Sequence, residues 1–178
     1  MIAFVHAPVS HPLRLFGEKV LEDSFPEEER PDVRQLNGRD TTLFHFDIIL
    51  QDEQPVGILT HWDFANFIYV EHFAIETQKR NHHIGSEALT LFSSTNKTIV
   101  LEAEPPTTPT ARRRISFYER HGLSVLPFDY LQPSYREGRA EVPLKILTNK
   151  EISPKDFQAI KNTLYKEVYK VSQQNIIS

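Results

Sequence analysis

The N-terminal part of the chain has the spacing of helices. From His11 to Ser24, apolar residues recur every three or four positions, as they do on one face of a helix. Ser10 precedes this segment as an N-cap, and Pro12 suits its first turn. A second, short helix is expected at Glu27–Glu29, because carboxylates suit the positive end of a helix dipole. The apolar face predicted for the first helix consists of Leu13, Phe16, Val20 and Leu21.

Strands are predicted in the segment that follows. Leu43–Leu50 and Val56–Phe64 flank the turn signal Asp52–Pro55, and this arrangement is typical of a hairpin. The next run, Phe67–Ile75, is rich in aromatic and β-branched residues and predicts a third strand. It passes through a polar loop into Ile84–Phe92, whose apolar residues have helical spacing.

The second half of the chain alternates between strand and helix patterns. The apolar run Thr98–Ala103 predicts a buried strand. This alternation places the chain in the α/β class, with a mixed sheet covered by helices. The remaining expected elements are a helix with Ala111, Ile115 and Tyr118 on one face ending near Gly122, strands Leu123–Leu131 and Val142–Leu147 paired across a connection containing Gly138, and a C-terminal helix over about 154–171 opened by Ser153 and Pro154.

The amino-acid composition excludes several kinds of chemistry and partner but says little about the fold. The 178 residues fit one domain, and we expect a single domain over 1–178 with a core at about 42–147. A net charge of -4 argues against a nucleic-acid partner. The absence of cysteine removes thiolate nucleophiles, disulfides and thiolate metal sites. We expect no signal peptide and no membrane association, because no stretch approaches ~20 apolar residues, and hence a cytoplasmic protein.

The junction between the third strand and the helix at Ile84–Phe92 is suited to an anion. The first turn of a helix has backbone N–H groups without intrahelical partners, and the dipole adds positive charge there. A pyrophosphate can therefore bind to the amides, with charge added by Arg80. Gly85 allows the backbone to approach a ligand closely because it has no Cβ.

Two motifs in the chain resemble those of the GNAT superfamily of N-acetyltransferases. Arg80 and Gly85 match the ends of its acetyl-CoA signature (Gln/Arg)-x-x-Gly-x-(Gly/Ala), with His83 where the first glycine is usual. Ile115–Leu123 resembles the family's helix pattern Phe-Tyr-x-x-x-Gly-(Phe/Leu). Together the matching elements cover about residues 42 to 147. The resemblance implies a mostly antiparallel, twisted central sheet with a splayed parallel strand pair, flanked by helices.

The resemblance also implies an acetyl-CoA site. Many members have an asparagine at the start of the tyrosine-bearing helix, and Ala111 occupies that place here. Arg112, Arg113 and Arg114 are either a solvated helix face or a substitute contact to the phosphates. The cofactor-binding residues implied by the resemblance are Phe73, Ala74, Ile75, Arg80, Asn81, His82, His83, Ile84, Gly85 and Ser86.

Acyl transfer to an amine needs a base and an acid. An alkyl ammonium loses its proton only near pH ~10.4, so a carboxylate or an ordered water must accept that proton. Glu71 is our candidate, as is the matching glutamate in relatives that acetylate small amines. Tyr118 is the candidate donor to the leaving thiolate. Each residue also has an alternative without a catalytic role. Glu71 would form a strand-end ion pair with an arginine, and Tyr118 would be a core aromatic residue.

Strand alternation predicts the surroundings of Glu71. It places Glu71 on one face with Tyr69, Phe73 and Ile75, and His72 on the opposite face. We interpret His72 as a hydrogen-bonded core histidine.

Other polar residues are candidates for binding the substrate or a metal. Glu102 and Glu104, on one face of the next strand, and Trp62 are substrate candidates, and either glutamate is a second choice of base. His82 and His83 are adjacent in one loop, and adjacent loop residues rarely converge on one ion. We therefore expect no metal cofactor.

The sequence as a whole favours an N-acetyltransferase of the acyltransferase class. It would transfer an acetyl group from acetyl-CoA to a primary amine of a small molecule or peptide by direct attack. The alternative is a non-catalytic acyl-CoA-binding sensor or interaction module of the same fold. The acceptor and the preferred acyl group are not specified by the sequence, and a homodimer and a monomer are both open.

Overall fold

The computed structural model describes residues 1–39, 42–136 and 138–171. It divides into two compact units, Met1–Leu101 and Glu102–Ser178, and each unit is described by itself. The assignment of the whole chain to one domain stays a prediction. No described helix has both the length and the apolar character that crossing a membrane requires.

The first unit contains most of a mixed sheet. Its strands follow the order β1-β2-β3-β4-β5, and the neighbours from β1 to β4 are antiparallel. β4 and β5 are parallel, with Phe67–Val70 paired to Thr98–Leu101. The predicted fold class, a mostly antiparallel sheet with one parallel pair, is therefore confirmed. The strands are β1 Ile2–His6, β2 Phe44–Gln51, β3 Gln54–Asp63, β4 Phe67–Ile75 and β5 Thr98–Ala103, of which Thr98–Leu101 belong to this unit.

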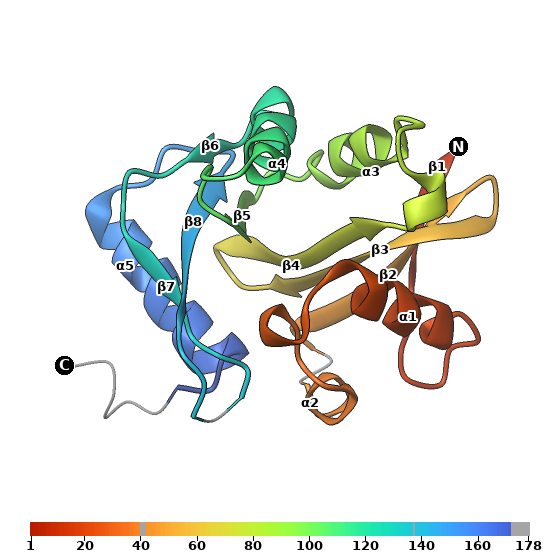
Figure 1. The fold of residues 1–178 in the computed structure, drawn as a ribbon, viewed down its shortest axis with the longest axis horizontal. Helices are drawn as coiled ribbons and strands as arrows, with labels where there is room; N and C mark the ends of the chain where they lie inside the picture. The colour runs from red at the N-terminus through yellow and green to blue at the C-terminus, as the bar shows by residue number, and fades with distance from the viewer. Residues whose placement is uncertain (40–41, 137, 172–178) are drawn as a thin grey trace. The chain divides into compact units, whose positions relative to one another are not determined.

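Helices cover both faces of this sheet (Figure 1). α1 packs on one face closely, because a Cβ added to Gly17 would lie 2.4 Å from the ring of Phe46. α3 packs on the other face, where the ring of Phe92 contacts those of Phe4 and His61. The helical elements of this unit are α1 Arg14–Ser24, η1 Glu27–Glu29, α2 Val33–Asn37, η2 Thr77–Lys79 and α3 Ile84–Phe92.

β4 contains a bulge at Glu71. Thr60 of β3 pairs with His72 and the next residue, His61, pairs with Val70, so the register skips Glu71. A bulge of this kind bends the strand and re-aims a side chain, and such bulges are common beside active sites. The parallel pairing with β5 also ends here, because Val70 and Leu101 form its last pair. Glu71 therefore lies where the regular sheet is interrupted.

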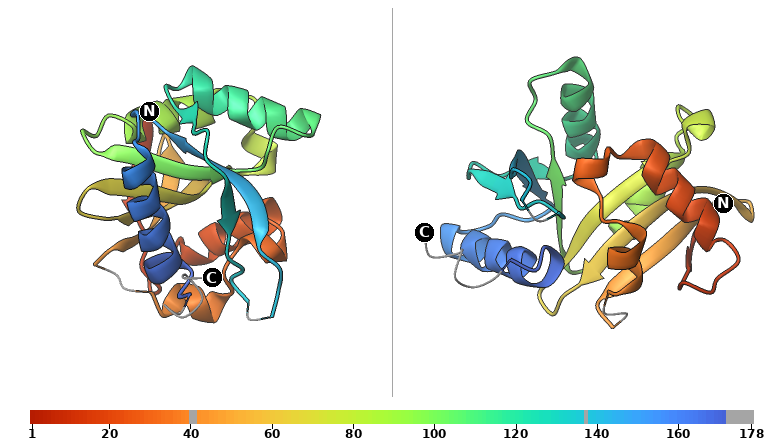
Figure 2. Two further views of the ribbon diagram at one scale, coloured as in Figure 1. Left: turned by 90° about the vertical axis from the view of Figure 1, so that its left-hand side faces the viewer. Right: turned by 60° about the horizontal axis from the view of Figure 1, so that its bottom comes forward.

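The second unit holds a small antiparallel ladder and two helices. β8 pairs with both β6 and β7 (Figure 2). The ring of Phe157 on α5 stacks on Phe128 with the centroids 4.6 Å apart. Gly122, with φ of 82°, follows α4 as a left-handed residue. The elements are α4 Pro109–Arg120, β6 Ser124–Val125, β7 Tyr130–Gln132, β8 Val142–Thr148, α5 Pro154–Thr163 and the π-helical turn η3 Leu164–Val168.

Most predicted elements are confirmed, and some boundaries are wrong. α1 begins at Arg14 with Leu13 at the N-cap, so the cap predicted at Ser10 is wrong. His11 takes part instead in turns, where its backbone N–H donates to Pro8 O. The strand expected over Leu123–Leu131 is divided into β6 and β7. The C-terminal helical segment ends at Val168, somewhat before the predicted end.

Three elements of the first unit were not predicted, namely β1, α2 and the short 3-10 helix η2. β1 is a short strand at the end of the strand order, and it forms through pairing with β2, far away in sequence. α2 has a local signal, a capping box in which Asp32 accepts from Gln35 N–H and the Gln35 side chain accepts from Asp32 N–H. The spacing of Asp32 and Gln35 is therefore the sequence signal that could have predicted α2.

Candidate active site

The turn between β4 and α3 contains two residues in the left-handed conformation. Asn81 has φ of 67° and His83 has φ of 60°. Alternating right- and left-handed residues turn successive N–H groups toward one side, which makes a concave site for anions. Glycine adopts positive φ without steric cost. His83 therefore has the backbone conformation expected of the glycine that the GNAT signature places there.

The N-terminus of α3 presents unpaired amides beside this turn. The first helical bond of α3 runs from Glu87 N–H to His83 O, so the amides of Ile84, Gly85 and Ser86 precede it. His83, the N-cap residue, makes no side-chain cap. Unpaired amides and the positive end of a helix dipole are features that favour an anion.

The side chain of Arg80 braces the turn. Its Nε donates to Ile75 O at 2.9 Å, and its Nη2 donates to Ser24 Oγ at 3.3 Å. The guanidinium thereby connects the end of β4 to the end of α1. Asn81, His82 and His83 are exposed beside it. Arg80 thus places positive charge next to the amides while part of its hydrogen-bonding capacity holds the loop.

β4 meets β3 closely just before the turn. A Cβ added to Gly57 would lie 2.4 Å from Ala74 O, so only glycine fits opposite Ala74 and Ile75. This contact fixes the last residues of β4, and Phe73 is half-buried beside them. Phe73, Ala74 and Ile75 are therefore held in a rigid strand that leads into the turn.

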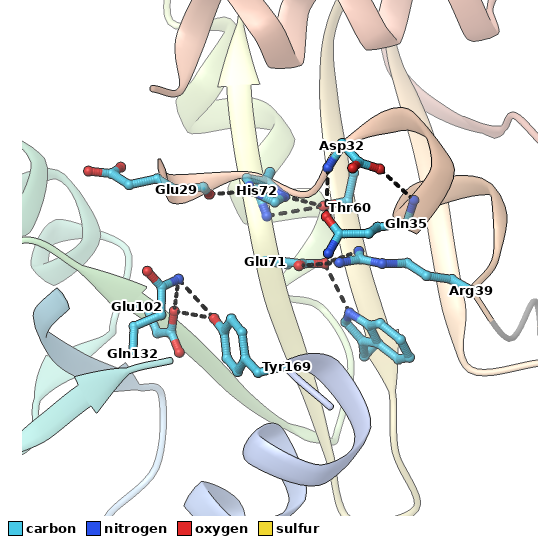
Figure 3. Close-up of polar contacts among 11 residues, drawn as sticks. Glu29, Asp32, Gln35, Arg39, Thr60, Glu71, His72, Glu102, Gln132 and Tyr169 are labelled. Atoms are coloured by element: carbon cyan, nitrogen blue, oxygen red, sulfur yellow. Dashed lines mark hydrogen bonds and ion pairs between the residues drawn. The ribbon is translucent and has the colours of Figure 1, made fainter. Parts of the chain in front are cut away.

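Glu71 is held in a buried ion pair, shown in Figure 3. Its two carboxylate oxygens accept from Nη1 and Nη2 of Arg39 at 2.5 and 2.7 Å. Trp62 Nε1 donates to the same carboxylate at 3.0 Å. The side chain of Glu71 is 0% exposed and that of Arg39 is 6% exposed. Trp62 is thus a partner of the carboxylate as well as a buried aromatic residue.

Aromatic rings enclose this ion pair. The guanidinium carbon of Arg39 lies 4.5 Å from the ring centroid of Phe44 and 5.1 Å from that of Trp62. Burying two charges costs several kcal/mol, which is recovered only with good geometry and further hydrogen bonds. The bidentate contact and the indole N–H supply both. The ion pair foreseen as the alternative for Glu71 does exist, with Arg39 as the partner, and sequence reasoning did not identify that arginine.

The bulge changes the predicted sides of β4. Directly paired residues share a face, so Tyr69, paired with Trp62, and His72, paired with Thr60, lie on one face. The carboxylate of Glu71 joins them there, at Trp62 Nε1. Phe73 and Ile75 pair with Leu59 and Gly57 and lie on the other face. The predicted grouping of Glu71 with Phe73 and Ile75, and the opposite orientation of His72, are therefore wrong, because the extra residue offsets the alternation by one.

His72 is a hydrogen-bonded core histidine, as predicted. It is 2% exposed, its Nε2 lies 3.0 Å from Glu29 O, and its Nδ1 lies 3.0 Å from Thr60 Oγ1. A carbonyl only accepts, so Nε2 carries the proton and Nδ1 accepts from the hydroxyl. Burial lowers the pKa of His72. The neutral ring therefore connects β4, through a hydrogen bond to Glu29 O, to the segment before α2.

Tyr118 lies on the inner face of α4 in the second unit. It is 8% exposed, and no hydrogen bond joins its hydroxyl to any other residue in the described part of the chain. Burial raises its pKa, with the nearby Arg114 acting in the opposite direction. The phenol is therefore protonated at neutral pH, as a proton donor must be.

Glu102 is the centre of a second polar cluster, also drawn in Figure 3. Its carboxylate accepts from the hydroxyls of Tyr130 and Tyr169 and from Gln132 Nε2, the last at 2.9 Å. Burial and the Glu102 carboxylate raise the pKa of Tyr130 well above its ordinary value. Glu102 is thus linked to β7 and to the end of the C-terminal helical segment, within the second unit.

The remaining candidates of the second unit make structural contacts. Glu104 forms an ion pair with Arg114 at 3.2 Å. Arg112 donates to Pro106 O, and Arg113 donates to Thr110 Oγ1. Ala111 is buried, and its N–H donates to the N-cap residue Thr108. This cap starts α4 with a backbone bond where the family often has asparagine.

The structure thus gathers the predicted residues into separate groups. Glu71 and Trp62 lie together in the first unit, which also holds the predicted cofactor residues of β4, the turn and α3. Tyr118, Glu102 and Glu104 belong to the second unit. Arg39, the ion-pair partner of Glu71, is the residue of this group that the sequence did not reveal. It is 32 positions from Glu71 and no local pattern marks it.

Comparison with known proteins points to one family. No protein-family model and no curated protein matches the chain. Among solved structures, a GNAT-family protein from Bacteroides thetaiotaomicron, assigned as an acetyltransferase, is 36% identical with a TM-score of 0.90, and the match covers 96% of this chain and 99% of that one.

Two more distant structures share the fold. A GNAT acetyltransferase from Elizabethkingia anophelis with acetyl-CoA bound is 12% identical, with a TM-score of 0.56 and coverage of 84% of this chain and 98% of that one. Naa50 from Arabidopsis thaliana, in complex with the bisubstrate analogue CoA-Ac-MVNAL, is 13% identical, with a TM-score of 0.58 and coverage of 85% and 99%. The identity and coverage of the Bacteroides match show that this chain belongs to the GNAT family of acetyltransferases.

Proposed function

We propose that this protein transfers an acetyl group from acetyl-CoA to a primary amine of a small molecule or a peptide. The observation that carries the proposal is the turn at Asn81 and His83, where two left-handed residues lie directly before the unpaired amides of α3. The bisubstrate complex of Naa50 is a peptide complex of that protein, and it makes a peptide amine a reasonable acceptor to test here.

The cofactor would be held mainly by backbone. The amides of Ile84, Gly85 and Ser86 would bind the pyrophosphate, and Arg80 would add positive charge. Phe73, Ala74 and Ile75 would flank the pantetheine arm along β4, and the exposed residues Asn81, His82 and His83 would form the rim. Backbone donors suit this task because they are fixed before the ligand arrives.

Transfer would proceed by direct attack of the amine on the thioester carbonyl. A C–N bond forms, the amine proton passes to the Glu71 carboxylate directly or through water, and the C–S bond then breaks. Tyr118 would donate its proton to the leaving thiolate. Arg39 and Trp62 would hold the Glu71 carboxylate in one orientation, and a fixed orientation is what a general base needs.

The proposal is tested by measuring CoA release from acetyl-CoA with a panel of small amines and short peptides. We expect amine-dependent release in the wild type. Glu71→Gln and Tyr118→Phe should lower kcat by roughly 10²–10⁴, the range for losing one acid or base. Glu151→Gln is the matched control, because it removes an exposed carboxylate with no role in the proposed site and should leave kcat within about twofold.

The alternative, a sensor that binds acyl-CoA without turnover, is separated by a second measurement. Titration calorimetry should detect acetyl-CoA binding in the wild type and in both catalytic variants. Binding without release for every amine tested would favour the sensor. Absence of binding would refute both functions.

A further inference from the structure

Three histidines and an aspartate lie on one face of the sheet formed by β1, β2 and β3. His6 pairs directly with Asp47, and His45 pairs directly with His61. Directly opposed residues share a face, and His45 and Asp47 are two positions apart on β2. His61 contacts Phe92 of α3, so this is the face that α3 covers. The four residues are called the histidine cluster below.

The donor atoms of the histidine cluster are close to one another. One ligand atom from each of His6, His45 and Asp47 lies within 4.8 Å of the other two. His6 Nδ1 is 3.2 Å from Asp47 Oδ1, and His61 Nδ1 is 3.5 Å from Asp47 Oδ2. The rings of His45 and His61 stack with their centroids 4.7 Å apart. Both oxygens of the carboxylate therefore face imidazole nitrogens.

One buried polar atom of the cluster has no hydrogen bond within the described part of the chain. His61 Nδ1 is buried and has no hydrogen-bond partner among the described residues. His61 and Asp47 are each 9% exposed. Buried polar atoms of this kind are rare, and a bound ion or water commonly satisfies them.

We propose that His6, His45 and Asp47 bind a divalent first-row transition-metal ion, with His61 orienting the carboxylate through its second oxygen. Two imidazoles and one carboxylate form a ligand set that zinc and other borderline metals accept. Ligating carboxylates are usually held by a further hydrogen bond. His61 Nδ1, 3.5 Å from Asp47 Oδ2, would form that bond when an ion draws the ligands together. No metal was expected from the sequence, where only the adjacent His82 and His83 had been considered.

The geometry needs only a small contraction to bind an ion. Zinc–nitrogen bonds of ~2.0–2.1 Å place tetrahedral ligands about 3.3 Å apart, compared with the present limit of 4.8 Å. His6 can move, because its side chain is 45% exposed at the rim, while that of Asp47 is 12% exposed at the floor. The exposed rim also gives an ion access from solvent.

The site would be separate from the acetyl-transfer chemistry and would stabilise the fold. It lies on the face opposite Trp62, the residue that contacts Glu71. Its ligands connect β1, at the end of the strand order, to β2. A bound ion should therefore secure the N-terminal strand. At a free Zn²⁺ concentration of 100 times Kd, we expect the Tm to rise by about 5 °C or more.

The test uses the full chain, stripped with EDTA and then dialysed, with Zn²⁺ binding measured by titration calorimetry. We expect one Zn²⁺ per chain, and visible absorption of a low-coordinate site when Co²⁺ replaces Zn²⁺. His6→Ala and Asp47→Asn should each weaken Zn²⁺ binding by about tenfold or more. His6 is exposed, so its variant should fold, and circular dichroism verifies this.

Two controls make the outcome decisive. His11→Ala removes another histidine of the first unit and should leave Zn²⁺ affinity unchanged. The double variant His82→Ala with His83→Ala removes the adjacent pair and should also bind normally. The proposal is overturned if the wild type binds no stoichiometric Zn²⁺, if folded His6→Ala binds as tightly as wild type, or if binding is lost in the His82/His83 variant.

Discussion

At the scale of single residues, Glu71 is the proposed general base, and Arg39 is its partner in a buried ion pair. Both side chains are removed from solvent and joined by two short hydrogen bonds. Breaking a buried pair on one side leaves an uncompensated charge in a medium of low polarity. The ion pair therefore holds the Glu71 carboxylate in place, and removing one of its partners should lower the stability of the fold.

Replacement of Arg39 should expose that cost. Arg39→Met is expected to lower the free energy of unfolding by about 3 kcal/mol or more, because Glu71 stays buried without its cation. Adding Glu71→Gln to Arg39→Met should recover part of the loss. Urea unfolding of the single and double variants measures both effects.

Arg34→Met is the matched control for this prediction. Arg34 is an exposed residue of α2, only a few positions away, and its loss should change stability by no more than about 0.5 kcal/mol. Equal stability of the two methionine variants would show that the buried pair has no such role.

At the scale of elements, the sequence predicted local patterns well and long-range pairing poorly. β4 and α3 were found with their correct limits, because an aromatic and β-branched run and a helical period mark them directly. β1 was missed because its pairing with β2 depends on residues far away in the chain. The bulge at Glu71 is a property of the register between two strands, so alternation along one strand could not reveal it.

The contrast between local patterns and long-range pairing also explains which site residues the sequence predicted. Arg80, His83 and Gly85 were recognised because they lie in one short motif. Arg39 comes from a separate segment, and only the folded sheet brings it to Glu71. The histidine cluster was missed for the same reason, since its members lie on three strands.

The left-handed backbone of His83, in the turn before α3, leads to a testable prediction. His83 has φ of 60°, a conformation that costs a residue with a Cβ roughly 1 kcal/mol and glycine nothing. His83→Gly should therefore keep or tighten acetyl-CoA binding and raise the free energy of unfolding by about 0.5 kcal/mol. His82→Gly is the control, because His82 is not among the residues with positive φ. Weaker acetyl-CoA binding in His83→Gly than in His82→Gly would show that the imidazole itself contacts the cofactor.

At the scale of the whole molecule, buried neutral histidines make stability depend on pH. The pKa of His61 is lowered from 6.5 to about 4, and that of His72 is lowered as well, in both cases mainly by burial. The unfolded chain therefore takes up protons below pH 6.5 that the folded chain does not. The contribution of these neutral histidines to the free energy of unfolding is fully present above pH 6.5 and decreases as the pH falls toward 4. For His61 the loss is about 2 kcal/mol by pH 5.

Urea unfolding at pH 7.5 and pH 5 with EDTA present measures this loss. The raised pKa of Asp47 acts in the opposite direction, so the sharper comparison is between variants. His72→Gln, which keeps a donor for Glu29 O, should show a smaller loss than the wild type. His82→Gln, at an exposed position, should lose as much stability as the wild type does. An equal loss in His72→Gln and the wild type would refute the contribution of His72.

The most direct test of the account is a crystal structure of the full chain with acetyl-CoA bound. We expect the pyrophosphate within hydrogen-bonding distance of the amides of Ile84, Gly85 and Ser86, and the thioester carbonyl beside the bulge at Glu71. A cofactor bound away from the turn, or a thioester that faces Glu102 with Glu71 remote from it, would contradict the account.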